Sequence, residues 1–479
     1  MDTIKIPLTD QIRPIPNIRT RTFFVVKARL DTDGMKTALD TLIREHWRRL
    51  GGRLHLDNAT GFYEYRVPQT FEPASEYKLF EWSTETKSGS IDAAAPQLMR
   101  KPVPEDCVSD SGVAFLPAIP TYDAEFRPSS WPFDFDDSPA DAPILYFHLT
   151  LYDDATVVAI SLPHVVGDQL GTASLVRAWM NVLAGKAPQP MMDEDPLPQG
   201  REWSQLSKEE ARGRKGRMHV RGTGEYVFVL IGFIPDLVLN KEEQEHVIFL
   251  PMPLIKSLRA RIVKQLEANG GDPGISDNDV ISAVMCKFAR IHKGPTTLSL
   301  SQSVNLRGRT PKLSGPEAGG FLHNAMAHSS SRFHLSKETP LHEIASQNRK
   351  GINEMLTPEG TEIHLAIVRE MVRRKQTLHT CEPFEKSYSI TSWSAAWKDV
   401  DFSPAVVGYS SLEKTQQEAH PVPELFVCGR GGEKTTPRRF HSTVMFRNDN
   451  GYWLDYSGTH KNVAAMKAHL ATDPNLERL

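Results

Sequence analysis

One histidine of this 479-residue chain is spaced from an acidic residue in a way that suits proton transfer. His164 and Asp168 form the pattern His-x-x-x-Asp. A neutral imidazole takes up a proton near physiological pH, so His164 is a candidate general base. The pattern is also compatible with a buried histidine whose ring is satisfied by a backbone carbonyl. It occurs again at His469 and Asp473, in a polar C-terminal segment with no strand before it, and we interpret that copy as chance.

The residues around His164 predict a strand, a turn and a helix. Residues 156–162 are apolar and rich in β-branched side chains, which is typical of a buried strand. Pro163 has no amide hydrogen to donate, so strand pairing is expected to stop just before the histidine. Apolar residues recur at helical spacing from Gln169 to Leu183. The aspartate of the pattern precedes this helix, where a carboxylate caps free amides.

Two arginines and one helix start are further candidates for a site. Arg307 and Arg309 occupy alternate positions, which predicts that both project to one side of a strand. They can be ordinary surface charges, but an arginine in a buried cleft usually has a carboxylate partner. Asp168 and Asp401 are the partners we propose. Ser276 begins a capping box, and the amides at such a helix start can also receive a phosphate.

These motifs resemble those of the BAHD-type acyl-CoA-dependent acyltransferases, particularly the fungal branch related to trichothecene 3-O-acetyltransferase. The resemblance rests on five segments in the same order along most of the chain. The segments are residues 35–43 with 50–54, residues 164–168, residues 275–283, residues 304–309 with 319–324, and residues 391–393 with 401–404.

The resemblance implies an α/β fold of two chloramphenicol-acetyltransferase-like subdomains. Each is a mixed β-sheet flanked by helices, and the active site lies in a tunnel between them. The length also favours two subdomains, because it exceeds what one hydrophobic core usually supports. We expect an N-terminal subdomain at residues 1–185, a proline-rich and then basic crossover linker at 186–222, and a C-terminal subdomain at 223–479. Residues 144–152 are predicted to form a hairpin with the strand before His164, and residues 84–142 are expected to be irregular.

The resemblance also assigns roles to individual residues. His164 becomes the general base, and Asp168, Arg307 and Asp401 support the site structurally. Ser276 and Arg309 are candidates for binding the cofactor-like CoA. No metal site is implied.

One part of the chain departs from the family pattern. Where the family reads Asp-Phe-Gly-Trp-Gly, residues 401–405 read Asp-Phe-Ser-Pro-Ala, so the tryptophan is lost. Where that indole helps to hold a tetrahedral intermediate, another donor must replace it. Thr391, Ser392 or a backbone amide near Ser403 are the candidates.

The predicted function is transfer of an acyl group, most simply acetyl, from acyl-CoA to a hydroxyl of a hydrophobic secondary metabolite. Acyl-CoA is a co-substrate in a ternary complex, and nothing is bound permanently. An N-acyltransferase acting on an amine is an alternative, as is a catalytically weakened binding protein on the same fold. A condensation-type domain of a peptide synthetase is a third, although such domains normally carry a double histidine where Pro163 stands here.

Composition excludes several other classes. A net charge of −3 argues against a nucleic-acid surface. The four cysteines are far apart and indicate neither a disulfide framework nor a zinc site. The N-terminus lacks the features of a signal peptide, and the longest apolar run, residues 226–239, is too short for a membrane span. We expect a cytoplasmic monomer whose partners are a small-molecule acceptor and acyl-CoA.

Overall fold

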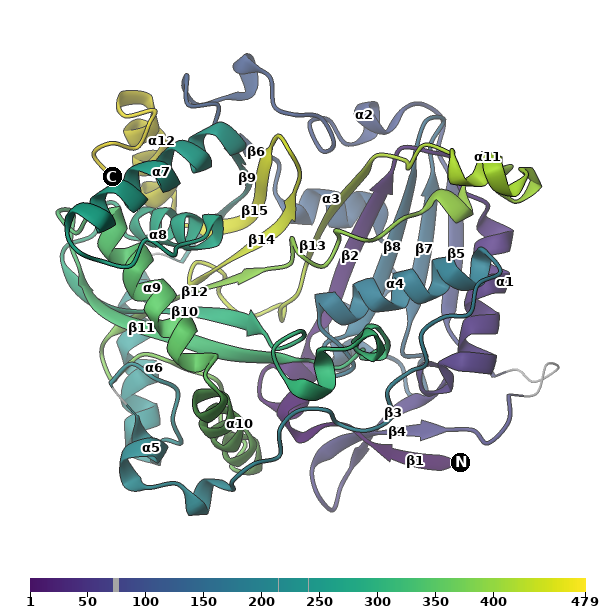
Figure 1. The fold of residues 1–479 in the computed structure, drawn as a ribbon, viewed down its shortest axis with the longest axis horizontal. Coiled ribbons are helices and arrows are strands. Elements are labelled where there is room, and N and C mark those ends of the chain that lie inside the picture. Colours follow the sequence, from purple (N-terminus) through teal and green to yellow (C-terminus); the bar gives the residue numbers. More distant parts are fainter. Residues whose placement is uncertain (72–76, 214, 240) are drawn as a thin grey trace.

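Two mixed β-sheets lie side by side and divide the chain into two lobes (Figure 1). The computed structural model describes residues 1–71, 77–213, 215–239 and 241–479. A small antiparallel sheet, in the order β1-β4-β3, adjoins the first lobe. Its strands are β1 (Asp2–Lys5), β3 (Arg53–Asp57) and β4 (Phe62–Val67).

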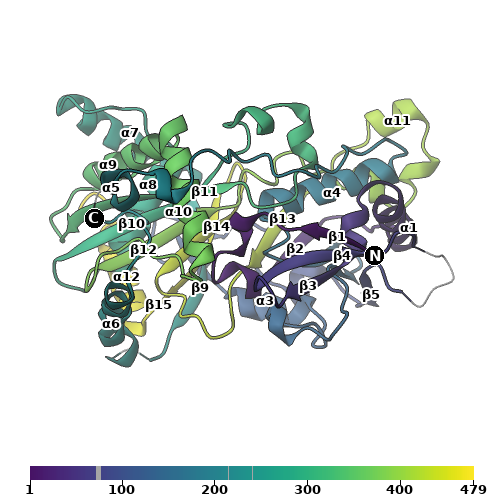
Figure 2. The same cartoon turned by 90° about the horizontal axis from the view of Figure 1, so that it is seen from below.

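The first lobe is built on a five-stranded sheet in the order β13-β2-β8-β7-β5. The central strand β8 is buried along its whole length, which explains its continuous run of apolar and β-branched residues. It pairs antiparallel with β7, so the predicted hairpin is confirmed. Helices α1 and α4 pack together on one face, and α3 lies on the opposite face (Figure 2). These elements are β2 (Arg19–Val26), β5 (Glu81–Thr86), β7 (Tyr146–Leu151), β8 (Thr156–Pro163), β13 (Leu425–Arg430), α1 (Thr32–Thr41), α3 (Ile119–Phe126) and α4 (Gln169–Leu183).

The second lobe is built on a seven-stranded sheet in the order β11-β10-β12-β14-β15-β9-β6. Strands β10, β12 and β14 run parallel, and the other pairs are antiparallel. The strands are β6 (Ala114–Leu116), β9 (Gln244–Pro251), β10 (Thr296–Asn305), β11 (Met326–Leu335), β12 (Lys386–Ser392), β14 (His441–Arg447) and β15 (Gly451–Gly458). Its helices include α7 (Met252–Ala268), α8 (Asp277–Ala289), α9 (Leu341–Met355), α10 (Pro358–Arg373) and α12 (His460–Thr472).

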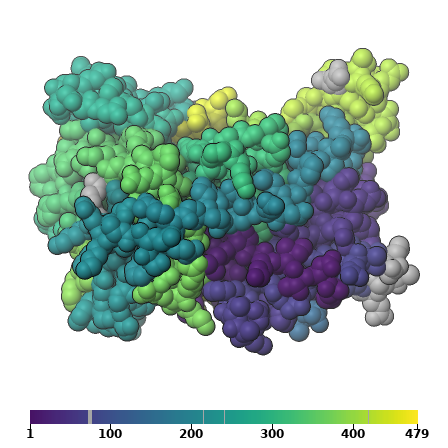
Figure 3. Space-filling view, turned by 60° about the horizontal axis from the view of Figure 1, so that its bottom comes forward, coloured from purple at the N-terminus to yellow at the C-terminus, as the bar shows by residue number. Residues whose placement is uncertain are grey.

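Two strands lie in the lobe opposite to most of their sequence neighbours. β6 comes from the first part of the chain but pairs with β9 in the seven-stranded sheet. β13 comes from near the C-terminus but forms an edge of the five-stranded sheet through β2. Residues 186–213 run across the surface from one lobe to the other and contain the short helix α5 (Lys208–Arg212) (Figure 3). The subdomain boundaries at 185 and 223 stay a proposal. β6 lies before the first boundary but belongs to the sheet of the second lobe, and β13 lies after the second boundary but belongs to the sheet of the first lobe.

Two local expectations are wrong. Residues 84–142 are not uniformly irregular, because they contain β6, α3 and the short helix α2 (Ile91–Ala94). Arg307 and Arg309 do not lie on a strand. β10 ends at Asn305, and a turn with a positive φ of 75° at Gly308 sends the two arginines in different directions.

The long apolar run forms α6 (Thr223–Leu239) on the outside of the second lobe. Val227, Ile231 and Val238 on this helix are exposed, whereas Leu230, Phe233, Ile234 and Leu237 line the cavity described below. Among the described residues, no helix combines the length and the hydropathy needed to cross a membrane.

Candidate active site

A cavity of about 750 Å³ lies between the two lobes, and His164 lines it. One wall comes from the first lobe, including residues 12–15, and the other from β10, β12, β14 and β15. On β10 and β12 small polar side chains face the cavity, alternating with apolar residues that face the core of the second lobe. The cavity-facing set is Ser301, Ser303, Asn305, Ser387, Ser389 and Thr391.

The strand-turn-helix around His164 fixes the backbone of this residue on both sides. Its amide donates to the carbonyl of Ile18 at 2.8 Å, and its carbonyl accepts from Asn324 Nδ2 at 2.9 Å. The imidazole is half-buried, and its Nδ1 atom has no hydrogen-bond partner in the described part of the chain. Burial lowers the pKa of His164 below its ordinary value, although the charge of Asp168 opposes this shift. The ring is therefore neutral at physiological pH.

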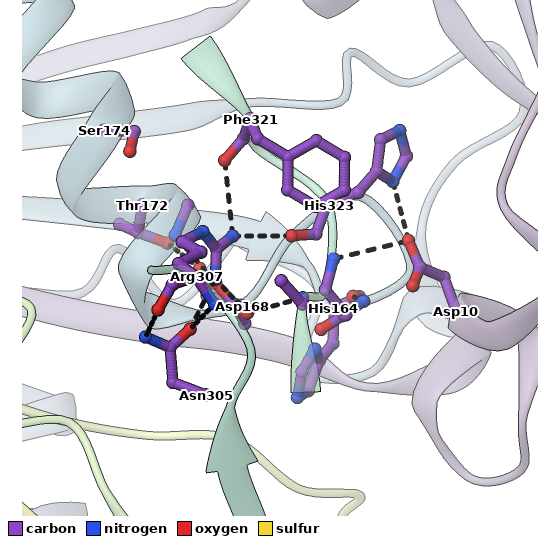
Figure 4. Close-up of polar contacts among 12 residues, drawn as sticks. Asp10, His164, Asp168, Thr172, Ser174, Asn305, Arg307, Phe321 and His323 are labelled. Carbon is purple, nitrogen blue, oxygen red and sulfur yellow. Dashed lines mark hydrogen bonds and ion pairs between the residues drawn. The ribbon is translucent and has the colours of Figure 1, made fainter. Parts of the chain in front are cut away.

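Asp168 turns away from His164 (Figure 4). Its Oδ1 accepts from the amide of Gly171 at 2.8 Å, which caps α4. Its Oδ2 accepts from Arg307 Nη1 at 2.8 Å and from the amide of Ala325 at 3.1 Å. With these three donors, the carboxylate holds the helix start rather than the imidazole.

Arg307 joins this helix start to residues 321–325. Its Nη2 donates to the carbonyls of Phe321 at 3.3 Å and His323 at 2.6 Å (Figure 4). The segment approaches α4 so closely that a Cβ added at Gly171 would lie 1.9 Å from the carbonyl oxygen of Leu322. Glycine is therefore required there for steric reasons. The contacts of Arg307 with Asp168 and with the carbonyls of Phe321 and His323 are here called the clamp. The clamp positions Asn324, which in turn donates to the backbone carbonyl of His164.

The same segment is anchored by a buried pair. His323 Nδ1 lies 2.7 Å from Asp10 Oδ2, and both side chains are almost fully buried. Burial raises the pKa of Asp10 and lowers that of His323 to about 3. Both shifts favour uncharged side chains, so this anchor adds little net charge beside the clamp.

Of the predicted site residues, Thr391 and Ser392 line the cavity together with His164 and Asp168. Ser392 Oγ lies 3.0 Å from Ser394 Oγ. No hydrogen-bond partner of Thr391 Oγ1 is found among the described residues. Thr391 therefore has the hydroxyl that is free to contact a ligand.

The remaining four predicted residues do not line the cavity, and one of them, Arg307, acts from behind it through Asp168. Asp401 is exposed, and it accepts from the amide and the hydroxyl of Ser403 at 2.8 and 2.6 Å. It holds its own turn, so the proposal that it pairs with an arginine is wrong. Arg309 is exposed and donates to the carbonyl of Asn305 at 2.9 Å. Ser276 caps α8 with Asp279 and accepts from Arg349 Nη2 at 2.7 Å.

Sequence reasoning missed two further cavity residues. His328, on β11, lines the cavity, and its backbone amide donates to His364 Nε2 at 3.2 Å. Burial lowers the pKa of His328 to about 4, with His164 as a nearby contributor. Arg438, in the loop before β14, also lines the cavity. The residues next to His328 and Arg438 in the sequence do not point to the cavity, because both places depend on pairings between distant strands.

The fold and the site together define a class. Two mixed α/β lobes with a strand-end histidine facing the cavity between them are the arrangement implied by the resemblance to BAHD-type acyltransferases. Among solved structures, TRI101 of F. graminearum in complex with coenzyme A and T-2 mycotoxin has a TM-score of 0.66 and 13% identity. The alignment covers 98% of this chain and 97% of that chain, and at this identity it establishes the fold.

Curated relatives extend the likeness to sequence. Acetyltransferase adrJ of Penicillium rubens is 25% identical, covering 89% of this chain and 86% of adrJ. O-acyltransferase pboC of Aspergillus ustus is 26% identical, covering 82% of this chain and 83% of pboC. A protein named transcriptional regulator sdnM, of Sordaria araneosa, is 25% identical over 91% of this chain and 89% of its own length. No protein-family model matches the chain. The resemblance and the α/β fold predicted from the motifs are confirmed.

Proposed function

We propose that this protein transfers an acyl group from acyl-CoA to a hydroxyl of an apolar small molecule, with His164 as the general base. The observation that carries the proposal is an imidazole, held at its backbone by two segments, that lines a cavity of about 750 Å³ between the lobes. Two of the relatives are named acetyltransferase and O-acyltransferase. The TRI101 structure contains coenzyme A and a small-molecule toxin.

In this mechanism both substrates occupy the cavity at once. His164 takes the proton from the acceptor hydroxyl while that oxygen attacks the thioester carbonyl. The carbonyl oxygen becomes an oxyanion, which a hydrogen-bond donor of the cavity stabilises. When the carbon–sulfur bond breaks, the CoA thiolate leaves and takes the proton from the imidazolium. Asp168 and Arg307 position the imidazole and do not exchange protons with it.

Thr391 is the oxyanion donor we favour over Ser392. Both hydroxyls are at the cavity, but the Ser392 hydroxyl is already 3.0 Å from that of Ser394. The indole donor of the family signature is absent from residues 401–405, whose side chains do not line the cavity. A side-chain hydroxyl on β12 supplies the missing hydrogen bond without any change in that turn.

Ser276 and Arg309 are proposed to contact the phosphates of CoA, and their common neighbour Arg349 supports this. Arg349 donates to Ser276, and the pKa of Arg309 is lowered by burial and then by the charge of Arg349. Because Arg349 is itself paired with Asp279, the positive charge available to a phosphate there is that of Arg309.

The direct test is binding of CoA without metal. We expect CoA to raise the melting temperature in the presence of EDTA, since a ligand at 100 times its Kd adds about 2.7 kcal/mol of stability. Acyl transfer is then measured by the release of free CoA thiol from acyl-CoA. A shift that appears only with added divalent ions, or no shift at millimolar CoA, contradicts the proposal.

A binding protein without activity is the second candidate. The lost tryptophan and the name of sdnM favour it. It predicts binding of small molecules without thiol release from acetyl-CoA. Offering amines as well as alcohols in the same assay separates N-acylation from O-acylation.

A further inference from the structure

Among the charged residues that line the cavity, the positive charges are not matched by free negative charges. Two of these residues are carboxylates, and each is paired with an arginine that does not itself line the cavity. Asp168 is paired with Arg307 at 2.8 Å. Asp455, on β15, accepts from both Arg430 Nε and Nη2, at 2.8 and 2.6 Å. The remaining charged residues of the described lining are the arginines Arg13 and Arg438. The cavity therefore carries a surplus of positive charge.

Arg438 differs from the arginines around it. Arg21 pairs with Asp123 at 3.0 Å, and Arg439 pairs with Glu243 at 2.6 Å. Arg438 has no carboxylate partner among the described residues, and its guanidinium makes one long contact, Nη2 to the carbonyl of Gly432 at 3.5 Å. Burial lowers its pKa to about 10, the charge of Arg430 adds to this shift, and the charges of Asp455 and Glu245 oppose it. A half-buried guanidinium that contacts no carboxylate directly is suited to an anion from outside the chain.

The sheet brings Arg438 to the same cavity as His164. Arg438 follows β13, whose last residue, Arg430, pairs with Arg21 on β2. On the other side of β2, Arg19 pairs with Pro163, which immediately precedes His164. The loop and the histidine thus follow the same end of the two strands on either side of β2, and both residues line the one cavity.

We propose that Arg438 binds a carboxylate of the acyl acceptor, so that the substrates of this protein are apolar hydroxy acids. This inference rests on the proposed function. A single guanidinium forms a bidentate pair with a single carboxylate. The phosphates of CoA are the other source of an oxyanion. They are proposed above to contact Ser276 and Arg309, which do not line the cavity.

The experiment compares two acceptors of equal length, 10-hydroxydecanoate and 1,10-decanediol. We expect the wild type to bind the hydroxy acid at least tenfold more tightly than the diol. Arg438→Gln removes that difference by weakening the hydroxy acid alone, and Arg438→Lys restores part of it. Arg373→Gln is the control, because Arg373 forms an exposed ion pair with Glu202 at 2.6 Å, outside the cavity lining. It leaves both affinities unchanged.

Stability of the ligand-free protein separates binding from a structural role. Because Arg438 lacks an ion pair, Arg438→Gln is expected to melt at the wild-type temperature or above it. A marked fall in melting temperature contradicts the proposal, since it assigns Arg438 to the fold.

Three binding outcomes overturn the inference. One is equal affinity of the wild type for the hydroxy acid and the diol. Another is an unchanged affinity for the hydroxy acid in Arg438→Gln. The third is loss of CoA affinity in Arg438→Gln, measured by calorimetry, which makes a CoA phosphate the partner. Binding of the hydroxy acid requires neither CoA nor His164. If the protein binds the hydroxy acid through Arg438 but never releases thiol, the proposed function is therefore wrong and the inference about Arg438 stands.

Discussion

The chain contains the same five-residue pattern twice, and the two copies differ in the contact one would first look for. At His469 and Asp473, at the C-terminal end of α12, the imidazole Nε2 lies 3.1 Å from the carboxylate Oδ2. At His164 and Asp168 the carboxylate faces Arg307. Neither residue of the copy with direct contact lines the cavity, and the copy without contact contributes both of its residues to the lining.

Local geometry explains the difference. On a helix, residues four apart lie on one face and meet. At His164 a strand ends and a helix begins between the two residues, so their side chains diverge. That divergence leaves the imidazole open to the cavity and assigns the aspartate to the helix start. A histidine–aspartate contact is therefore a poor guide to which histidine faces the cavity in this protein.

Replacing each histidine in turn gives the largest expected contrast. His164→Ala is expected to lower kcat about 10²–10⁴-fold, because the general base is lost. His469→Ala is the matched control and retains activity. Circular dichroism and melting curves verify that both variants fold. Wild-type turnover in a folded His164→Ala protein contradicts the role of this residue.

Replacing each aspartate tests the structural role. Asp168→Asn leaves Arg307 buried without its counter-ion, and breaking such a pair costs about 3–5 kcal/mol. We expect a lower melting temperature. In the profile of kcat/KM against pH, we expect little change in the pH at which the rate falls on the acid side, called the acid limb. Asp473→Asn is milder, since the amides of Glu477 and Arg478 that Asp473 accepts from lie in the chain terminus. An unchanged melting curve with a strongly displaced acid limb in Asp168→Asn indicates instead that Asp168 tunes the imidazole directly.

The hydroxyls of Thr391 and Ser392 on β12 test which group stabilises the oxyanion in the cavity beside His164. Thr391→Val is expected to lower kcat roughly tenfold or more with little change in KM, as for a contact made only in the transition state. Ser392→Ala is the control with a smaller effect, because its hydroxyl is engaged by Ser394. If neither variant changes kcat, a backbone amide holds the oxyanion.

The pH dependence gives the smallest effect. Only the neutral imidazole acts as a base, so the rate falls as pH drops through the pKa of His164. Burial lowers that pKa from the ordinary value near 6.5, so activity persists into more acidic solution than for an exposed histidine. The profile of kcat/KM against pH measures this limb. An acid limb above pH 6.5 contradicts the assignment.

The sequence predicted the surroundings of His164 well, because they depend on local properties. The bounds of α4, Gln169–Leu183, and its aspartate cap follow from apolar spacing and one capping residue. Arg438 and His328 were not predictable in this way. Their places in the cavity depend on strand pairings between segments distant in the chain, such as β13 with β2. Asp401 shows the opposite error, since a family motif suggested a distant partner where a local turn suffices.

The position of β13 has a consequence for how this protein is made. β2 and β8 leave the ribosome early, but the strand that covers the free edge of β2 begins only at Leu425. At about 5–20 residues per second, translation needs on the order of tens of seconds to reach it. During that time β2 presents an unpaired edge, which is a template for aggregation. The first lobe is thus completed only after residues 425–430 have been made, and truncation before residue 425 removes a strand from a lobe that lies far upstream in the sequence.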